Sequence, residues 1–294
     1  MFDLESLAAM KLAFAGMGVM GFPMAGHLAR AGHDVVVYNR TPEKAARWVE
    51  TYGGRAAPTV AEAAREAEIF LLCVGADDDV RAVVGEALTT LPAGAVVVDH
   101  TTTSAVVARD MAELAEAGGR AFVDAPVSGG QAGAENGQLT IMCGAEPAVF
   151  ERVRPVLEVY AKALRLMGGV GSGQLTKMVN QICIAGVVQG LAEALHFTKR
   201  AGLDPQAVYE AISKGAAQSW QMDNRWKTMS EGKFDFGFAV DWMRKDLGLV
   251  LDEAARNGAA LDMTRRVDGF YAEVQAQGGR RWDTSSLVAR LEKP

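Results

Sequence analysis

The stretch Gly16-Met17-Gly18-Val19-Met20-Gly21 decides how the first half of this chain folds. It follows an apolar run at Leu12–Ala15 and precedes a helical pattern at Met24–Ala31. A second apolar run, Asp34–Tyr38, comes directly after that pattern. A G-x-G-x-x-G turn that leaves a buried strand and opens a helix predicts a Rossmann-type βαβ unit.

Each glycine of this turn has a role that other residues would fill poorly. Gly16 allows the tight turn, Gly18 lets the backbone approach a pyrophosphate, and Gly21 lets the helix pack closely on the strand. The amides at the start of the helix, with its positive dipole end, bind phosphate. We therefore predict a dinucleotide site formed by Gly16, Met17, Gly18, Val19, Met20 and Gly21. The alternative is a glycine-rich turn that binds nothing.

The end of the second apolar run bears on which dinucleotide binds. NAD enzymes usually place Asp or Glu there, on the ribose hydroxyls. This chain has Asn39-Arg40-Thr41 instead. The Arg40 guanidinium would pair with a 2′-phosphate, with Asn39 and Thr41 as further donors. We therefore favour NADP over NAD as the cofactor. In the alternative, Arg40 is an exposed loop residue that stacks on adenine.

Short apolar runs and helical patterns continue to alternate as far as Gly168. The further runs are Ile69–Val74, Ala95–Asp99, Ala121–Asp124 and Leu139–Cys143. Their continuous Val, Ile and Leu content predicts strands buried on both faces of a parallel, doubly wound sheet. Stretches such as Pro42–Tyr52 and Val80–Leu88 are long enough for crossover helices. We expect an α/β, NAD(P)-binding Rossmann domain over residues 11–168.

The second half of the chain has a different pattern. After the cluster Gly168-Gly169-Val170-Gly171-Ser172-Gly173, strand-like runs give way to long stretches rich in Ala, Leu, Gln and Glu. The first covers Gln174–Ala201, within a long helix that should begin near Ser172. Asp204-Pro205 predicts the next helix start, with Asp as the cap and Pro in the first turn. We expect an all-helical domain over residues 169–294.

Composition excludes several classes of protein. Thirty basic and thirty-six acidic residues give a net charge of −6, too acidic and too evenly mixed for a general nucleic-acid binder. Apolar runs such as Ile182–Val188 are far shorter than the ~20 residues of a membrane span. Met1–Met10 lacks the features of a signal peptide, and we expect it to be an extension ahead of the fold. Three scattered cysteines and four histidines form no metal, zinc or disulfide pattern, so we expect no metal. We expect a cytoplasmic protein with neither nucleic-acid nor membrane partners.

Four motifs occur in one order along nearly the whole chain after Met10. They are the glycine turn continued as Phe14–Ala25, then Asp124-Ala125-Pro126-Val127-Ser128-Gly129-Gly130, then Gly168–Asn180, and finally Lys245-Asp246-Leu247. In this combination the chain resembles the β-hydroxyacid dehydrogenase family, to which 3-hydroxyisobutyrate dehydrogenase belongs. The resemblance implies that the helical half contributes to the substrate site and to oligomerisation.

Oxidation of a hydroxyacid needs a group that accepts the hydroxyl proton and donors that bind the carboxylate. Lys177 and Asn180 are three residues apart on the predicted helix and share a face, which would point into a cleft between the domains. A partly desolvated lysine has a lowered pKa that suits proton transfer. The resemblance implies that Lys177 is the catalytic acid/base and that Asn180 orients the substrate oxygen. The alternative is a solvated Lys beside a surface Asn.

The resemblance also implies further contacts to the substrate and the cofactor. Glycines 129 and 130 leave backbone amides accessible after a strand, in a concavity that binds anions, and the family uses Ser128-Gly129-Gly130 for the carboxylate. The other implied contacts are Lys245 with substrate and cofactor, Asp246, Val74, Gly75 and Thr102 with the cofactor, and Trp220 with the substrate. The chain departs from the family at Thr101-Thr102 and Ala105, where Ser-Thr and a proline are commoner, and at Val74-Gly75, often Leu-Pro. In the alternatives without a ligand contact, Lys245 forms an exposed ion pair on a helix and Trp220 is a core residue.

We expect an NAD(P)-dependent enzyme that transfers a hydride between nicotinamide and a small β-hydroxyacid or its semialdehyde, most like 3-hydroxyisobutyrate dehydrogenase. Within the same chemistry, the alternative is a reductase of succinic semialdehyde, glyoxylate or tartronate semialdehyde. A more distant alternative is a non-catalytic NADP-binding scaffold. Lys177 argues against the scaffold and against imine reductases, which typically lack this lysine. Because the helical half is apolar-rich and too thin to cover its own long helix, we expect a homodimer or homotetramer.

Overall fold

The structure is a computed structural model that describes residues 9–292. Its internal contacts divide the chain into two compact units, which meet in sequence between Lys177 and Met178. The expectation for Met1–Met10 falls mainly on residues 1–8, which lie outside the described part of the chain. Met10 itself joins the fold, because its carbonyl oxygen accepts a hydrogen bond from the Asp34 amide at 3.0 Å.

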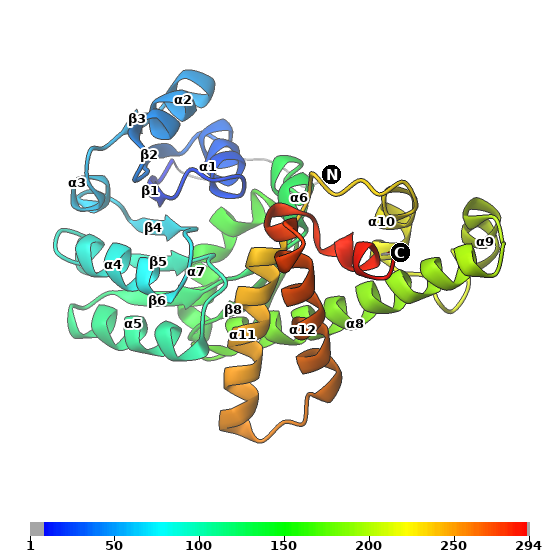
Figure 1. Cartoon of the computed structure of the whole chain (residues 1–294). Helices are drawn as coiled ribbons and strands as arrows, with labels where there is room; N and C mark the ends of the chain where they lie inside the picture. The colour runs from blue at the N-terminus through cyan, green and yellow to red at the C-terminus, as the bar shows by residue number, and fades with distance from the viewer. Residues whose placement is uncertain (1–8, 293–294) are drawn as a thin grey trace. The chain divides into compact units, whose positions relative to one another are not determined.

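The first unit alternates strands and helices, as predicted (Figure 1). Its strands are β1 (Lys11–Ala15), β2 (Asp34–Tyr38), β3 (Arg55–Ala56), β4 (Ile69–Leu72), β5 (Val96–Asp99), β6 (Ala121–Asp124), β7 (Val127–Ser128), β8 (Leu139–Gly144) and β9 (Ala161–Gly168). Its helices are α1 (Gly21–Arg30), α2 (Pro42–Tyr52), α3 (Val60–Ala64), α4 (Asp77–Ala87), α5 (Ala105–Ala117), α6 (Gly130–Glu135) and α7 (Pro147–Glu158).

One nine-stranded sheet holds this unit together. Its order is β3-β2-β1-β4-β5-β6-β8-β7, with β9 paired to β8, and all pairs from β3 to β6 are parallel. The first six strands therefore have the order of a Rossmann fold, and the predicted fold class is confirmed. Successive strands are added toward one edge of the sheet up to β3 and toward the other edge from β4 onward. The sheet therefore has its switch point between β1 and β4, which is where such sheets bind ligands.

The expectation of a wholly parallel sheet was wrong beyond β6. There β8 runs antiparallel to both β6 and β7, and β9 is again parallel to β8. Only a short connection with one small helix, α6, separates β7 from β8, and such links join antiparallel strands more readily than parallel ones. Three strands were missed: β3 and β7 have two residues each, and β9 alternates exposed and half-buried positions instead of forming an apolar run.

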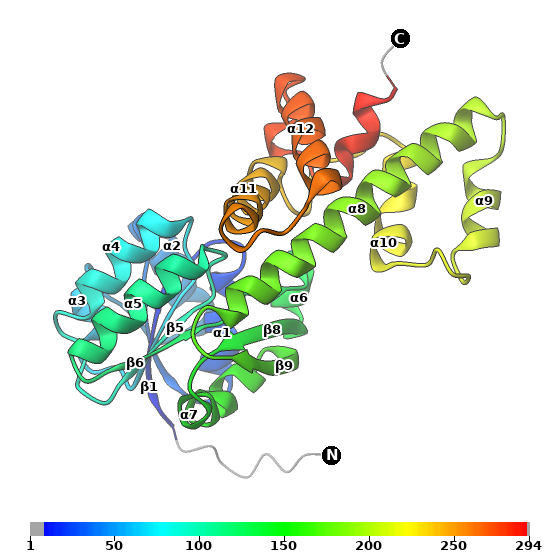
Figure 2. The same ribbon diagram turned by 90° about the horizontal axis from the view of Figure 1, so that it is seen from below.

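Two apolar layers cover the two faces of the sheet. Alternate residues of β1 point to opposite faces, so Leu12 and Phe14 join one layer and Ala13 and Ala15 the other. The first layer packs against α1, α2 and α7, and the second against α3, α4 and α5. Figure 2 shows α4 and α5 on one side of the strands and α7 on the other. Burial on both faces explains the continuous apolar runs of the central strands.

The second unit is helical, as predicted. It contains most of α8 (Ser172–Arg200), with α9 (Pro205–Ile212), α10 (Trp220–Ser230), α11 (Val240–Asn257), α12 (Asp262–Ala276) and two short 3-10 helices, η1 (Gly279–Arg281) and η2 (Thr284–Arg290). The predicted start at Asp204-Pro205 is confirmed, since the Asp204 carboxylate accepts hydrogen bonds from the amides of Gln206 and Ala207. Figure 1 shows α11 and α12 side by side. Their buried residues form one core with those of α8, α10 and η2.

A buried carboxylate near the end of the chain holds three segments of this unit. Asp283, 1% exposed, pairs with Arg225 at 3.0 Å and accepts the Phe238 amide at 2.9 Å. It also accepts the hydroxyl of Ser285 at 2.6 Å, at the start of η2. Breaking a buried pair of this kind leaves an uncompensated charge, which is strongly destabilising. Asp283 therefore has a structural role.

Helix α8 has the predicted length, and as a whole it is more apolar than its short apolar runs suggested. An 18-residue window within it has a mean hydropathy of 1.3, which by length and composition would suffice to cross a membrane. Of that window, 44% is buried inside the structure. Core helices meet the same criterion, so the feature is weak evidence for a membrane span.

Candidate active site

The glycine turn lies at the carboxyl edge of the sheet, where the loops after β1 and β4 touch. Gly16 has φ +102°, and a Cβ there would lie 2.1 Å from the carbonyl oxygen of Cys73. A Cβ at Gly21 would lie 1.9 Å from the carbonyl oxygen of Gly16. A side chain at either position would therefore force the turn or the start of α1 apart.

Gly18 differs from the other two glycines, because a Cβ placed there meets nothing within 4 Å. Helix α1 begins close by with neither a side-chain cap nor an acidic residue in its first turn. Uncapped amides at the positive end of a helix attract phosphate. The open backbone at Gly18 and the uncapped helix together fit the pyrophosphate of a dinucleotide.

The segment after β2 is bonded to the glycine turn. Asn39 accepts the Met17 amide through Oδ1 at 2.8 Å and donates from Nδ2 to the Thr41 carbonyl oxygen at 2.9 Å. Asn39 thus fixes the two loops together and keeps one amide hydrogen for a ligand. The Arg40 side chain is 89% exposed, and its nearest acid is Asp79 at 3.5 Å. An ion pair this exposed contributes little to stability, so the Arg40 guanidinium remains available to a phosphate.

A turn of three threonines follows β5 and meets the loop after β4. The Thr101 hydroxyl accepts a hydrogen bond from the Val74 amide at 3.0 Å. Val74 was predicted to contact the cofactor, but its amide already has this partner within the protein. Thr101 and Thr103 are 2% and 0% exposed, whereas Thr102 between them is half-buried. Thr102 is therefore the threonine of this turn that a ligand can reach. Sequence reasoning missed the residue that holds the turn, Gln174, whose amide bonds to both Thr101 and Thr103.

The carboxylate of Asp124, at the end of β6, anchors the start of α8. It accepts the amides of Gly171 at 2.7 Å and Gln174 at 2.8 Å. Burial raises the pKa of Asp124 to about 6, although these backbone hydrogen bonds favour the charged form and oppose the shift. A Cβ on Gly173 would lie 2.6 Å from the Asp124 carbonyl oxygen, so glycine is needed where the helix meets the strand.

A neutral, buried histidine also forms hydrogen bonds at this edge of the sheet. His100 lies between Asp99 and the threonine turn, and burial lowers its pKa to about 4. Its Nδ1 lies 2.7 Å from the Ala125 carbonyl oxygen, which can only accept, so Nδ1 carries the proton. Nε2 then accepts from the Tyr160 hydroxyl at 2.8 Å. These bonds join the threonine turn to the Asp124-Ala125-Pro126 segment.

Lys177 and the Ser128-Gly129-Gly130 segment complete the predicted residues of the first unit. Lys177 lies in the second turn of α8 and is 7% exposed, so the solvated alternative is wrong. Gly129 and Gly130 are exposed and have φ +130° and +60°. They begin α6, which has no side-chain cap, and their binding of a carboxylate stays a prediction.

The predicted residues of the second unit form a chain of polar contacts through Gln181, which sequence reasoning missed. Asn180 donates to the Gln181 Oε1 at 2.8 Å, and Gln181 donates to Asp246 Oδ2 at 2.6 Å. Asp246, 2% exposed, pairs with Lys245 at 3.2 Å. Lys245 is therefore part of a largely buried pair, unlike the exposed pair of the alternative. Both missed glutamines lie within one turn of Lys177, which is the only sequence signal for them.

Trp220 is not a core residue. It is 54% exposed, and the Arg225 guanidinium lies 5.0 Å from the centre of its ring. The core alternative is therefore wrong, and the contact of Trp220 with the substrate stays a prediction.

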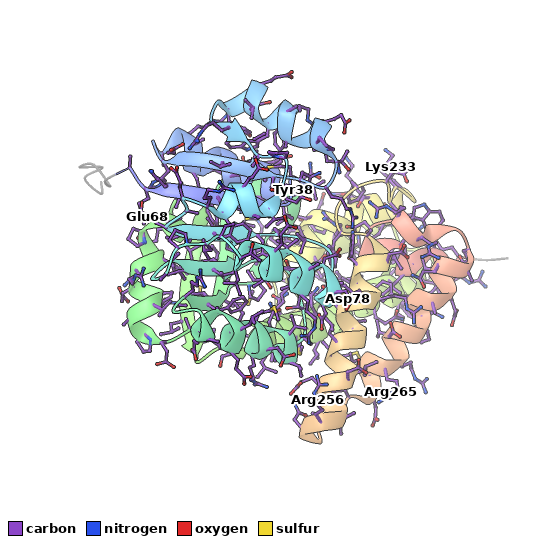
Figure 3. All side chains as sticks on the ribbon, turned by 90° about the vertical axis from the view of Figure 1, so that its left-hand side faces the viewer. Tyr38, Glu68, Asp78, Lys233, Arg256 and Arg265 are labelled. Carbon is purple, nitrogen blue, oxygen red and sulfur yellow. The ribbon has the colours of Figure 1, made fainter. Side chains whose placement is uncertain are left out.

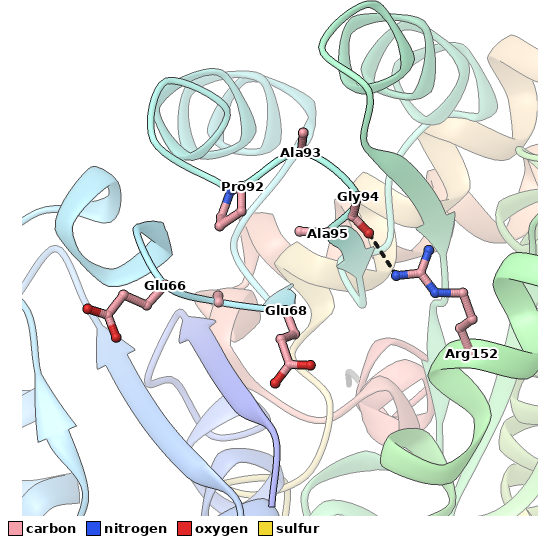
Figure 4. Close-up of a pocket in the computed structure, with 8 residues that line it drawn as sticks. Glu66, Glu68, Pro92, Ala93, Gly94, Ala95 and Arg152 are labelled. Atoms are coloured by element: carbon pink, nitrogen blue, oxygen red, sulfur yellow. Dashed lines mark hydrogen bonds between the residues drawn. The ribbon is translucent and has the colours of Figure 1, made fainter.

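Two surface hollows are lined by other residues. One, of about 240 Å³, is lined by Glu66, Glu68, Arg152 and the Pro92–Ala95 segment (Figure 4). It lies at the amino edge of the sheet: Figure 3 shows Glu68, ahead of β4, far from Tyr38 at the end of β2. The other, of about 460 Å³, lies in the second unit beside Phe236 and Trp282. Among residues 9–292, no group of three or more His, Cys, Asp or Glu is placed to hold a metal ion.

The three glycines should respond differently to alanine. Gly16→Ala should lower the melting temperature, because its Cβ would overlap the Cys73 carbonyl. Gly18→Ala should leave the melting temperature unchanged and weaken NADPH binding about tenfold, which corresponds to about 1.4 kcal/mol, because its Cβ would fill the space left for a pyrophosphate. Thermal unfolding and NADPH fluorescence titration measure the two effects. Unchanged NADPH affinity in Gly18→Ala would place the pyrophosphate elsewhere.

Asp124 should make stability depend on pH. Its pKa is raised in the folded state, so its contribution to stability is full below the unfolded pKa and is lost as the pH rises through about 6. Relative to Asp124→Asn, the wild type should lose about 2 kcal/mol of unfolding free energy between about pH 4 and pH 7. Urea titrations of both proteins across this range measure the difference. A difference that stays constant with pH would mean that Asp124 ionises normally.

Comparison with known proteins places both units in one family. Residues 11–169 match the family model described as the NAD binding domain of 6-phosphogluconate dehydrogenase. Residues 171–291 match the model described as NAD-binding of NADP-dependent 3-hydroxyisobutyrate dehydrogenase. The two matches together cover nearly all of the described chain.

Two relatives and one solved structure are similar to this chain along nearly their whole lengths. An uncharacterized oxidoreductase of Shewanella frigidimarina is 64% identical over 96% of this chain and 98% of its own. The 2-hydroxy-3-oxopropionate reductase of Escherichia coli is 36% identical over 96% and 97%. The structure of Mycobacterium tuberculosis 3-hydroxyisobutyrate dehydrogenase with L-serine is 30% identical and covers 97% of this chain and all of its own, with a TM-score of 0.89. The chain therefore belongs to the β-hydroxyacid dehydrogenase family and is an NAD(P)-dependent oxidoreductase of CH–OH groups.

Proposed function

We propose that this enzyme interconverts a small β-hydroxyacid and its semialdehyde, most like 3-hydroxyisobutyrate dehydrogenase, with Lys177 as the acid/base. The observation that carries the proposal is the placement of Lys177. It is buried in the second turn of α8. The start of this helix is hydrogen-bonded to Asp124, which precedes Ser128 by four residues. A buried lysine is less costly to deprotonate than a solvated one, which suits proton transfer.

The residues of the chain would share the work as follows. The amides of Gly129 and Gly130 and the hydroxyl of Ser128 bind the substrate carboxylate. Lys177 takes the proton from the hydroxyl oxygen during oxidation and returns it during reduction. Asn180, one turn further along α8, donates to that same oxygen and orients it. Lys245 and Trp220 provide further contacts to a small, partly apolar acid. A bound nicotinamide supplies the hydride chemistry.

A second substrate is favoured by one specific finding. The Escherichia coli relative is named a 2-hydroxy-3-oxopropionate reductase and is 36% identical along almost its whole length. The same carboxylate and acid/base groups would serve this semialdehyde acid, so the side chain of the substrate separates the two proposals. Succinic semialdehyde and glyoxylate, the other two alternative substrates, are tested together with these compounds. Absorbance of the reduced cofactor, followed across a panel of these hydroxyacids and aldehydes, identifies the best substrate, and no turnover of any of them would reject the proposed function.

Replacing Lys177 should remove the chemistry and leave the cofactor site intact. Lys177→Ala should lower kcat by about 10²–10⁴-fold, the usual contribution of positioned proton transfer. NADPH affinity should change less than about twofold, because the glycine turn lies on another segment. Lys177→Arg should rescue poorly, since a guanidinium stays protonated. Steady-state kinetics on the best substrate measure these effects, and activity within about fivefold of the wild type would assign the proton to another group.

We propose NADP as the preferred cofactor, because Arg40 is exposed and no acid ends β2. A charge-assisted hydrogen bond to the 2′-phosphate contributes about 1.5–3 kcal/mol. Arg40→Asp should therefore shift the ratio of kcat/KM towards NAD by about tenfold to a hundredfold. Lys44→Asp, in the first turn of α2, makes the same change of charge on an exposed residue and serves as the control. A wild type that already prefers NAD would show that Arg40 does not bind a 2′-phosphate.

We also propose that the enzyme is a homodimer or homotetramer that covers α8. Exposed apolar or small residues follow the helical period along this helix: Val179, Cys183, Val187, Gly190, Ala194 and Phe197. Val179 and Phe197 are 60% and 69% exposed, an arrangement typical of an interface rather than of solvent.

Val187→Glu should dissociate the oligomer, because it places a charge in the middle of this stripe. Val106→Glu changes an equally exposed valine on α5 and should leave assembly unchanged. Sedimentation velocity at micromolar concentration measures both variants. A wild type that sediments as a monomer would reject the proposal.

A further inference from the structure

One fully buried side chain connects the helix that carries Lys177 to the turn that carries Thr102. Gln174 is 0% exposed. Its Nε2 donates to the Thr101 carbonyl oxygen at 2.7 Å, and its Oε1 accepts the Thr103 amide at 3.0 Å. The two bonds hold the residues on both sides of Thr102, which is the half-buried residue of the turn.

The other end of this connection is equally fixed. The backbone amide of Gln174 donates to Asp124 Oδ2 at 2.8 Å, and Gly171 donates to the other oxygen at 2.7 Å. The first turn of α8 therefore cannot slide or rotate without breaking bonds to a buried carboxylate. Lys177 lies three residues after Gln174 on the same side of the helix. The side chain of Gln174 therefore fixes the position of the threonine turn relative to the helix backbone that carries Lys177.

We propose that Gln174 is a positioning residue: by holding Thr101 and Thr103, it sets Thr102 in register with Lys177 on α8. The inference rests on the proposed function, in which Lys177 moves the proton, and on the contact of Thr102 with the cofactor that the family resemblance implies. Gln174 is fully buried, and in this proposal it acts through the turn that it holds.

The chemistry of the side chain supports positioning over simple packing. An apolar side chain of similar length would fill the same space. The primary amide offers an NH2 donor and a carbonyl acceptor in one plane, which matches a carbonyl and an amide two residues apart. Removing it leaves the Thr101 carbonyl and the Thr103 amide buried without these bonds, so the turn would rearrange to satisfy them.

The first test replaces Gln174 by a side chain of similar shape without hydrogen bonds. Gln174→Met should weaken binding of NADPH, or of NADH if the wild type binds it more tightly, by about tenfold. Amide hydrogen exchange at Thr103 should become faster. The kcat on the best substrate should fall about tenfold to a hundredfold, with KM changed less than about threefold, because misplacement of a cofactor by about 1 Å has effects of this size. Gln189→Met, a second buried glutamine on α8, is the matched control and should change none of these quantities.

A second variant distinguishes positioning from loss of stability. Gln174→Glu carries an acid that, when protonated, has one donor and one acceptor like the amide it replaces. Its cofactor affinity, relative to the wild type at the same pH, should therefore recover between about pH 8 and about pH 5.5, since burial raises the pKa of such an acid. Gln174→Met should show no recovery, because it has no group to protonate.

The outcomes separate this inference from the proposed function. Cofactor affinity and Thr103 exchange unchanged in Gln174→Met would overturn the role of Gln174, whatever the kinetics. So would a Gln174→Glu protein whose relative affinity does not respond to pH. If the wild type turned over none of the hydroxyacids or aldehydes, the proposed function would fail, and cofactor affinity and amide exchange would still decide whether Gln174 positions the turn.

Discussion

The contact on which the site depends is the carboxylate of Asp124 bonded to the first amides of α8. It joins the end of a central strand to the helix that carries Lys177. The four amides at the start of a helix have no partners within the helix, and here a buried acid from another element satisfies two of them. Burial raises the pKa of that acid to about 6, so the contact is made at a cost in desolvation. Two glycines, at 144 and 173, leave room for it, because a Cβ at either would overlap Asp124.

Around this contact, the loops at the carboxyl edge of the sheet are bonded to one another. Asn39 holds the glycine turn, Thr101 holds the loop after β4, and Gln174 holds the threonine turn. The groups that a ligand can reach at this edge include the open backbone at Gly18, the exposed Arg40 and the half-buried Thr102. Such an arrangement lowers the cost of ordering the site when the cofactor binds.

The parts of the fold that follow local rules could be predicted from the sequence. The glycine turn, helix α2, the start of α8 and the Asp204 cap were all placed correctly, because each is set by backbone sterics, capping or periodicity over a few residues. The two-residue strands β3 and β7, the half-exposed β9 and the antiparallel pairing of β8 were not. Strands so short carry no periodic signal, and their pairing depends on partners far away in the sequence.

The sequence by itself determined the Rossmann-type fold of the first half, the helical second half and the family, since glycine, proline and apolar patterns act locally and the four motifs keep their order. It also predicted that Lys177 and Asn180 share one face of a helix, and the family resemblance implied the role of Lys177. What the tertiary structure decided is which side chains hold that lysine in place. Asp124, Gln174 and Gln181 bond to residues that are distant in the chain, and a single sequence carries no record of such pairs. Hydrogen bonds between buried groups depend on distances of a few tenths of an ångström, and those distances exist only once the sheet and the helix have packed.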